Sequence, residues 1–168
     1  MRKNLSKIKL DETDYALLSL IQKDGRASNV KLAQTLNLSE TPCWRRLKRL
    51  EETGCIRGYQ ASLNHRLLGF GVLAFVHVSF AIHTDDSPEL FEEAIQSIPE
   101  VLSCHHVTGE ADYFLQIVAE DLDAYGRLLS RQLRKLPGVT SIKSSFSLRE
   151  LKKSTDLPLE ENKQISNK

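Results

Sequence analysis

The spacing of apolar residues changes at Val72, and that change limits what the chain can fold into. Before Val72 the apolar residues recur at intervals of three and four, which is typical of helices that bury one side. At Val72 a strand-like run begins: VLAFVHVSFAI has apolar residues in both alternating sets, as expected for a strand covered on both faces. The sequence therefore predicts a helical front part and a rear part built on a sheet.

The front part contains signals for three short helices. Each begins at a residue that can accept a hydrogen bond from the first helical turn, namely Asp11, Ser28 and Ser39. Each is followed by a residue suited to a turn, namely Gly25, Asn37 and Gly54. The second helix should bury Val30, Leu32, Ala33 and Leu36. Three short helices, with a turn of about three or four residues between the second and third, match the helix-turn-helix pattern.

Positive charge is concentrated in this front part. Residues 1–60 contain 12 Lys and Arg against 7 Asp and Glu, a difference of +5, whereas residues 61–168 contain 11 against 15, a difference of −4. This asymmetry suggests that the front part meets a polyanion and that the rear part does not.

The third predicted helix, within SETPCWRRLKRL, separates its apolar and basic side chains. A helical wheel centred on Cys43 places two leucines beside it and Arg45 and Lys48 on the opposite side. A helix divided in this way can enter the major groove of DNA, so Arg45 and Lys48 are the candidates to contact base edges. The other candidate DNA contacts flank these two or lie at the helix starts and just beyond the third helix: Ser28, Ser39, Glu40, Thr41, Trp44, Arg46, Arg49 and Arg57.

Two alternatives remain open for this basic helix. Three-helix packing with a solvated charged face also occurs in proteins that bind no nucleic acid. Arg46 lies near the apolar stripe, where it could hold a carboxylate instead of a phosphate. Steep loss of affinity with rising salt would favour DNA over a protein partner.

The rear part predicts the order strand, helix, strand, strand, helix, strand. Strands are expected over 72–82, 101–108, 112–119 and 139–148, with helices between Ser87 and Pro99 and from about Asp121 to Pro137. The helices should bury two stripes: Leu90, Phe91, Ala94, Ile95 and Ile98, then Leu122, Tyr125, Leu128, Leu129, Leu133 and Leu136. This order is the ferredoxin-like βαββαβ plan, so the fold class is α+β. Leu73 and Phe75 would lie on the sheet face without helices, and we expect a second copy to cover it.

The domain organisation follows from these elements. We expect a flexible basic tail over 1–9, a helix-turn-helix domain over 10–60, a linker with a short helical turn over 61–71, a ferredoxin-like domain over 72–154 and a C-terminal tail over 155–168. The stretch CIRGYQASL after the third helix reads as a strand pair or a single outgoing strand, a possible wing.

Three stretches carry a family resemblance: LDETDYALLSLIQKDGRAS, LAQTLNLSETPCWRRLKRLEETGCIRGY and VTGEADYFLQI. Over about residues 10 to 159 the chain resembles the Lrp/AsnC, or feast/famine, transcriptional regulators. The resemblance implies a winged helix-turn-helix, a linking strand and an effector domain that forms homodimers and often rings of dimers, such as octamers. TPCWRRLKRLE and STDLPL are most similar to the branch that includes cysteine-responsive regulators.

The resemblance also implies a ligand loop with a G-x-x-D signature, here Gly109, Glu110, Ala111 and Asp112. In the family, amino acids bind around this loop where dimers meet. Asp112 could hold an α-ammonium group, while Thr108 and the backbone N–H groups could hold a carboxylate. Alternatively, Gly109 simply permits the turn and Asp112 closes it by hydrogen bonding.

Other classes of protein receive little support. No apolar run approaches the roughly 18 to 20 residues of a membrane span, and the start lacks the apolar core of a signal peptide, so we expect a cytoplasmic protein. The three cysteines form no C-x-x-C, and His105 and His106 should point to opposite faces of a strand, so no disulfide framework or metal site is expected. Catalytic motifs are absent, and we expect no enzyme and no cofactor other than an amino acid effector.

The function expected from the sequence is that of a sequence-specific DNA-binding regulator. Its assembly or DNA affinity would respond to a small amino acid. The alternative is an amino-acid-sensing module whose N-terminal helices contact a protein partner.

Overall fold

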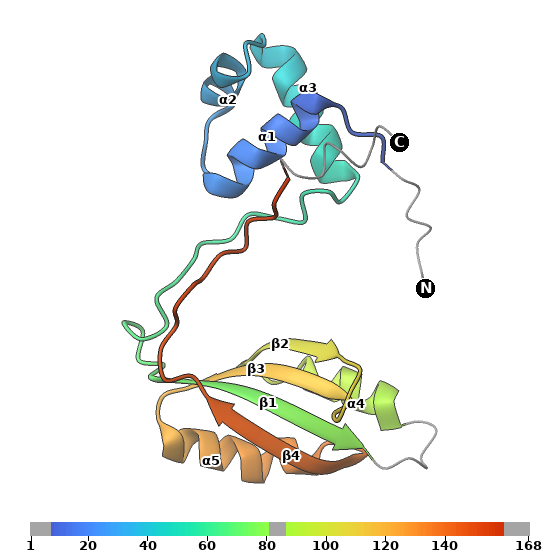
Figure 1. Ribbon diagram of the computed structural model, residues 1–168, viewed down its shortest axis with the longest axis vertical. Helices are drawn as coiled ribbons and strands as arrows, with labels where there is room; N and C mark the ends of the chain where they lie inside the picture. Colours follow the sequence, from blue (N-terminus) through green and yellow to red (C-terminus); the bar gives the residue numbers. More distant parts are fainter. Residues whose placement is uncertain (1–7, 81–86, 160–168) are drawn as a thin grey trace. The chain divides into compact units, whose positions relative to one another are not determined.

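The computed structural model describes residues 8–80 and 87–159 of the 168-residue chain. These residues form two compact units (Figure 1). The N-terminal unit runs to Ser62 and also includes the described residues from Lys152, and the C-terminal unit comprises Leu63–Leu151. Three predicted stretches lie outside the described residues: residues 1–7 of the basic tail, residues 81–82 of the first strand and residues 160–168 of the C-terminal tail. No helix within the described ranges is long and apolar enough to cross a membrane.

The N-terminal unit contains the three predicted helices. They are α1 (Glu12–Lys23), α2 (Asn29–Thr35) and α3 (Glu40–Glu52). The side chains of Leu17, Ile21, Leu32, Ala33, Cys43 and Leu50 form one buried cluster among the three helices. Burying each large apolar side chain stabilises such a unit by about 1.5–3 kcal/mol, which offsets the short length of the helices.

The predicted helix starts are confirmed. Asp11 and Asp14 form a capping box at the start of α1, and the Ser28 side chain accepts a hydrogen bond from the Lys31 N–H at the start of α2. Ser39 stands at the N-cap of α3, although its side chain makes no capping hydrogen bond. Asn37 adopts a left-handed conformation, with φ of 53°, which turns the chain sharply between α2 and α3.

Two predictions for the N-terminal unit are wrong. Val30 was expected on the buried side of α2, but it is 44% exposed because Leu32 and Ala33 alone reach the core from that short helix. No strand forms in residues 55–63, although a strand pair or single strand was expected there. A lone extended segment has no neighbouring strand to receive its backbone hydrogen bonds, so it remains irregular.

The linker ends in the predicted helical turn. Asn64 closes it twice, because its carbonyl accepts the Leu68 N–H at 3.3 Å and its side-chain oxygen accepts the Arg66 N–H at 3.1 Å. Gly71 follows, and its N–H donates to the carbonyl of Glu120 at 3.1 Å. This close approach leaves no room for a side chain, since a Cβ at Gly71 would lie 2.9 Å from that oxygen.

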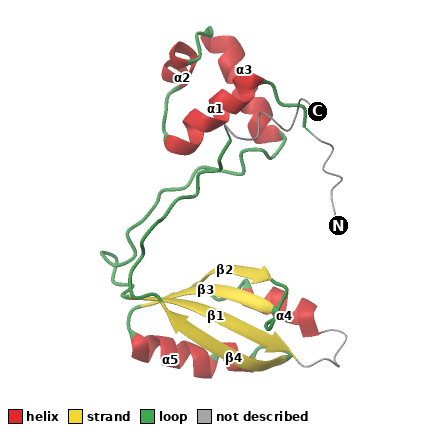
Figure 2. Ribbon diagram, in the orientation of Figure 1, coloured by secondary structure: helices red, strands yellow, loops and turns green. Residues whose placement is uncertain are grey.

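The C-terminal unit has the predicted βαββαβ order (Figure 2). Its elements are β1 (Val72–Phe80), α4 (Ser87–Ile95), β2 (Val101–His106), β3 (Tyr113–Ala119), α5 (Leu122–Arg131), the 3₁₀ turn η1 (Leu133–Lys135) and β4 (Val139–Phe146). The strands are antiparallel in the order β2-β3-β1-β4. This is the strand order of a ferredoxin-like fold, so the predicted α+β class is confirmed.

Both helices of this unit pack on one face of the sheet. The buried cluster joins side chains of α4 and α5, such as Phe91 and Leu128, to Val76 and Leu115 of the central strands. Leu90 and Leu122 were expected in the buried stripes but are 51% and 61% exposed. Each lies in the first turn of its helix, and Leu90 is turned about 100° from Phe91, which occupies the core position.

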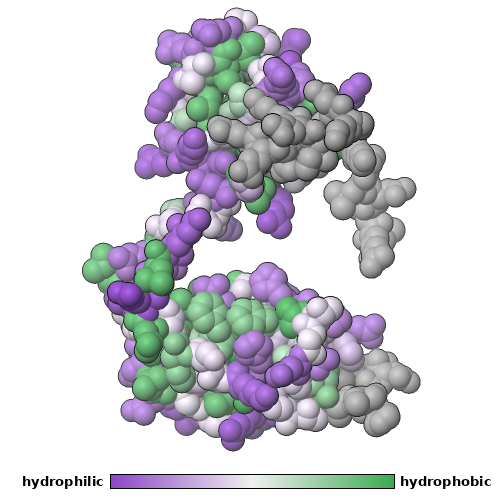
Figure 3. All heavy atoms as spheres, in the orientation of Figure 1, coloured by the Kyte–Doolittle hydropathy of each residue, from purple (hydrophilic) through white to green (hydrophobic). Residues whose placement is uncertain are grey.

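The other face of the sheet has no helix. The rings of Phe75 and Phe114 stack on it at 5.8 Å between centroids, and the His77 ring meets Phe114 edge-on at 5.0 Å. Hydrophobic residues gather over the sheet of this unit in Figure 3. Strand β1 is therefore apolar on both faces, as its sequence predicted.

Candidate nucleic-acid interface and ligand loop

The side of α3 that points away from the core is basic and exposed. Arg45 and Lys48 are both exposed, and Trp44, which precedes Arg45 in the chain, is 50% exposed. The Lys48 ammonium lies 5.1 Å from the centre of the Trp44 ring and 3.7 Å from a carboxylate oxygen of Glu52. Within the described residues no acidic group forms a salt bridge with Arg45. Its five N–H donors are therefore available to an incoming acceptor.

Arg46 and Arg49 are bound to helix α1. An Nη1 atom of Arg46 lies 2.6 Å from Asp11 and 2.9 Å from Asp14, while Arg49 donates to the other oxygen of Asp14. The Asp14 side chain is only 1% exposed, so these pairs are shielded from water on the carboxylate side. The two hydrogen bonds to carboxylates raise the pKa of the Arg46 guanidinium. We call Asp11, Asp14, Arg46 and Arg49 the α1–α3 clamp.

The clamp changes how two predicted DNA contacts are interpreted. Arg46 and Arg49 were candidates for DNA contacts, with the holding of a carboxylate left open for Arg46. The structure places both guanidiniums on α1 carboxylates, because α3 crosses the start of α1 at this level. These ion pairs join α3 to α1, and contact of either arginine with DNA stays a prediction.

The remaining predicted DNA contacts lie near the starts of α2 and α3. The Asn29 side-chain amide donates to the Glu40 carbonyl at 3.0 Å, which joins these two helix starts. Ser28, Ser39, Glu40 and Thr41 are exposed around this junction, and Arg57 is exposed in the irregular segment beyond α3. Exposed N–H groups at a helix start attract phosphate groups, so this arrangement suits a nucleic-acid backbone.

The predicted ligand loop is the connection Val107–Asp112 between β2 and β3. Its ends are tied together, since the Val107 N–H donates to the Asp112 carbonyl at 2.9 Å. The Asp112 side chain accepts the Phe80 N–H at 2.8 Å, and the Asp112 N–H donates to Val78 at 3.0 Å. The Asp112 side chain therefore fastens the loop to the end of β1, whereas the Asp112 backbone carbonyl closes the turn.

The tip of this loop is open. Thr108, Gly109 and Glu110 are exposed, and Gly109 has a φ of 119°, a conformation suited to glycine. The Glu110 carboxylate forms a salt bridge with the Lys143 ammonium on β4, at 3.9 Å. The tip thus presents polar groups and backbone N–H groups while Asp112 holds its base.

Sequence reasoning missed several of these partners. Asn29 and Lys143 were not singled out, because their partners are set by helix packing and by strand register. Asp14 left a signal: it lies three residues before Leu17 and seven before Ile21, so it falls on the buried stripe of α1. A carboxylate in such a stripe requires a cationic partner.

Cys104 and two histidines of the sheet, His77 and His106, lie among aromatic and apolar side chains. Burial, with the nearby Glu92 carboxylate, raises the pKa of the Cys104 thiol to about 11, the opposite of an activated nucleophile. His106 stacks on Tyr113, whereas His77 lies on the other face beside Phe114. The described residues contain no group of three or more His, Cys, Asp or Glu side chains that could hold a metal ion.

Comparison with known proteins assigns both units to described domain families. Residues 10–57 match the family described as winged helix-turn-helix DNA-binding. Residues 73–157 match the family described as the Lrp/AsnC ligand binding domain. These two matches together span both the candidate nucleic-acid interface and the candidate ligand loop.

Individual relatives are similar over nearly the whole chain. The leucine-responsive regulatory proteins of Klebsiella pneumoniae and of Escherichia coli strain K12 are each 40% identical over 148 residues, covering 88% of this chain and 90% of the relative. A transcriptional regulator from Neisseria meningitidis, solved as a complex with L-methionine, has a TM-score of 0.87 and 40% identity over 91% of this chain and 99% of its own. A feast or famine regulatory protein from M. tuberculosis, also complexed with L-methionine, has a TM-score of 0.79 and 31% identity over 89% of this chain and 99% of its own.

Proposed function

The chain belongs to the Lrp/AsnC family of transcriptional regulators, and from that premise we propose that α3 reads DNA through Arg45 and Lys48 while the α1–α3 clamp holds α3 in place. The protein is a DNA-binding transcriptional regulator with an amino-acid-binding domain. Members of this family are regulators and not enzymes.

One observation supports the division of roles on α3: four basic side chains lie within five residues, and two of them are bound to α1. Arg45 and Lys48 face solvent, where an arginine can form two hydrogen bonds to a guanine edge. Arg57 and the exposed starts of α2 and α3 would contact phosphates, which position the helix without reading the sequence.

The test is the substitution Arg45→Ala, with Arg26→Ala as its matched control. Arg26 is also an exposed arginine of the N-terminal unit, but it lies outside α3. If Arg45 reads a base, its loss costs about 1–3 kcal/mol of binding to the specific site and relaxes sequence preference at one position. Arg26→Ala should leave the preference unchanged. Equal weakening on specific and random DNA would make Arg45 a phosphate contact and contradict the assignment.

We further propose that the open face of the sheet in the C-terminal unit joins two copies of the protein. The support is the stacked pair Phe75 and Phe114 on that face and the 56% exposure of Leu102 on the neighbouring strand. Aromatic side chains at the centre of an apolar patch dominate such interfaces. Phe114→Lys should therefore shift the purified protein to a smaller species in sedimentation, and an unchanged mass would contradict this interface. Rings of dimers remain a prediction.

The effector is proposed to be a small amino acid held at the loop Val107–Asp112. Two relatives were solved with L-methionine, and other relatives are named leucine-responsive. The stretches TPCWRRLKRLE and STDLPL add cysteine as a candidate, because they resemble the branch that includes cysteine-responsive regulators. Screening the twenty amino acids by thermal denaturation identifies the ligand, because a compound that binds only the folded state raises its stability.

Asp112 permits a sharper test of this loop. Asp112→Asn keeps an oxygen that can accept the Phe80 N–H, whereas Asp112→Ala removes it. If Asp112 contacts an ammonium group, both variants lose the ligand response. If Asp112 only fastens the loop, Asp112→Asn keeps the response, and the ammonium contact is excluded.

A further inference from the structure

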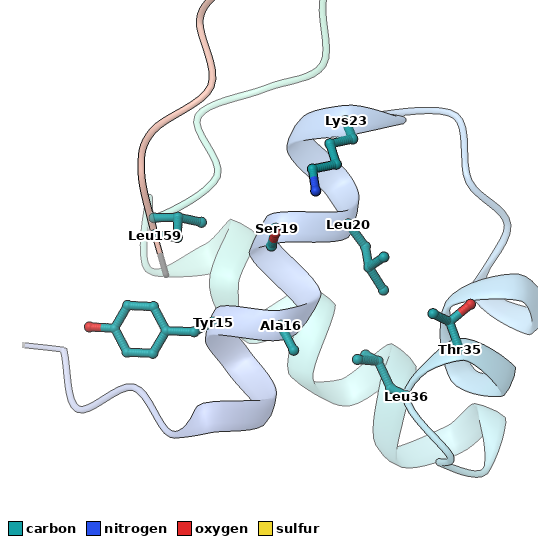
Figure 4. Close-up of a pocket in the computed structure, with 8 residues that line it drawn as sticks. All are labelled: Tyr15, Ala16, Ser19, Leu20, Lys23, Thr35, Leu36 and Leu159. Atoms are coloured by element: carbon teal, nitrogen blue, oxygen red, sulfur yellow. The ribbon is translucent and has the colours of Figure 1, made fainter. Parts of the chain in front are cut away.

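A groove of about 300 Å³ lies on the outer side of α1 within the N-terminal unit (Figure 4). Its lining comes from α1, from the end of α2 and from the C-terminal segment of the chain: Tyr15, Ala16, Ser19, Leu20, Lys23, Thr35, Leu36 and Leu159. None of these residues belongs to α3, so the proposed contacts with DNA do not use this groove.

Gln22 binds the backbone of the C-terminal segment at one residue. Its side-chain nitrogen donates to the Leu157 carbonyl at 3.0 Å, and its side-chain oxygen accepts the Leu157 N–H at 3.0 Å. One side-chain amide thereby satisfies both backbone groups of Leu157, as a residue on an adjacent antiparallel strand would. The two residues are 135 positions apart in the sequence, so this contact does not arise from local structure.

The C-terminal segment is shaped for this contact by its own sequence, STDLPL. The Ser154 hydroxyl accepts the Asp156 N–H at 3.2 Å, and the Leu159 N–H donates back to the Leu157 carbonyl at 2.8 Å around Pro158. Proline fixes one backbone angle, so less conformational freedom is lost on docking. The turn brings Leu159 to the groove, where Figure 4 shows it beside α1 near Tyr15 and Ser19.

We propose that the groove on α1 is a docking site for the chain's own segment Ser154–Leu159, and that docking attaches the C-terminal unit to the DNA-binding unit at a second point. The chain leaves the N-terminal unit after Ser62 and returns to it at Lys152. With the segment docked, both ends of the C-terminal unit are fastened to the DNA-binding unit. With the segment released, only the linker after Ser62 remains.

The intramolecular occupant is favoured by chain length. Leu157 lies only six residues beyond Leu151, where the C-terminal unit ends. The tether is therefore short, and the effective concentration of the docking segment at the groove is high. A second attachment restricts the orientations of α3 relative to the unit that joins two copies. It should therefore strengthen binding to paired half-sites without altering binding to one half-site, a consequence that rests on the proposed function.

The direct test compares Gln22→Ala with Gln34→Ala, an exposed glutamine of α2 in the same unit. Hydrogen exchange of the Leu157 amide should accelerate about tenfold or more in Gln22→Ala, because its acceptor is lost, and should not change in Gln34→Ala. Unchanged exchange in Gln22→Ala would overturn the docking site. This readout requires no DNA, so it is independent of the proposed function.

DNA binding then tests the second attachment. Gln22→Ala and a chain ending at Lys153 should both bind paired half-sites roughly tenfold more weakly and bind a single half-site as the full chain does. Equal affinity of all chains for paired half-sites would overturn the second attachment, whereas a full chain that binds neither DNA would instead contradict the proposed function. Mixing the Gln22→Ala chain with the shortened chain tests the occupant: restored protection of Leu157 would assign the groove to a second copy and overturn the intramolecular docking.

Discussion

The α1–α3 clamp makes a quantitative prediction through Asp14. Its carboxylate accepts hydrogen bonds from Arg46, Arg49 and the Asp11 N–H, and its side chain is 1% exposed. Asp14→Asn preserves the shape and the oxygen that faces the Asp11 N–H, but it removes the charge. A hydrogen bond to a charged group contributes about 1.5–3 kcal/mol.

The expected loss is closer to one such bond than to two. Arg46 keeps its second partner, Asp11, at 2.6 Å, and the Arg49 side chain is 46% exposed, so water can replace its lost acceptor. We therefore expect Asp14→Asn to lower the free energy of unfolding of the N-terminal unit by about 2 kcal/mol. That is a large fraction of the stability of a small domain.

Urea denaturation followed by tryptophan fluorescence measures this loss. Trp44 is the single tryptophan of the chain and lies on α3, so the signal reports on the N-terminal unit. The matched control is Lys31→Ala, which removes the ion pair with Asp24 at 3.5 Å between side chains that are 68% and 51% exposed. That pair should contribute less than about 1 kcal/mol. If Asp14→Asn costs no more than Lys31→Ala, the buried carboxylate does not hold α3 and the reasoning is refuted.

Three further predictions concern pH, packing and thiol reactivity. Burial raises the pKa of Asp11, but hydrogen bonds from the Asp14 backbone N–H and from Arg46 outweigh it, so the pKa lies below its ordinary 3.8. The stability that this carboxylate contributes is therefore present above pH 3.8 and is lost as the pH falls through the lowered pKa. Acid titration followed by the tryptophan signal should show this loss. Gly71→Ala places a Cβ 2.9 Å from the carbonyl oxygen after β3 and should lower the melting temperature, whereas Gly126→Ala, in open space on α5, should leave it unchanged or raise it. Cys104, with its pKa raised to about 11, should react with iodoacetamide far more slowly at pH 7.5 than the exposed Cys55 in mass spectrometry.

Local signals in the sequence predicted most of the fold. The N-caps Asp11 and Ser28, the turn at Asn37 and the order of strands and helices follow from residues a few positions apart, which is the range of capping and of helical or strand periodicity. The basic outer side of α3 could be predicted as well, because the periodicity of a single helix decides which of its side chains share a side.

Partners distant in the chain were decided by tertiary structure alone. Whether Arg46 faces DNA or a carboxylate depends on how α3 crosses α1, and the helical wheel of α3 contains no information about that crossing. Likewise, Asp112 meets the Phe80 N–H only because β1 and β3 pair in one register.

The sequence by itself determined which segments are helices and strands and which side chains each can present, since those properties depend on neighbours along the chain. Tertiary structure decided how the presented groups are used. Gln22 and Leu157 show this best: neither residue carries a signal in the sequence, and their two hydrogen bonds exist only because the folded chain returns to α1. Backbone groups can be satisfied by any suitable donor or acceptor, so packing must choose the partner.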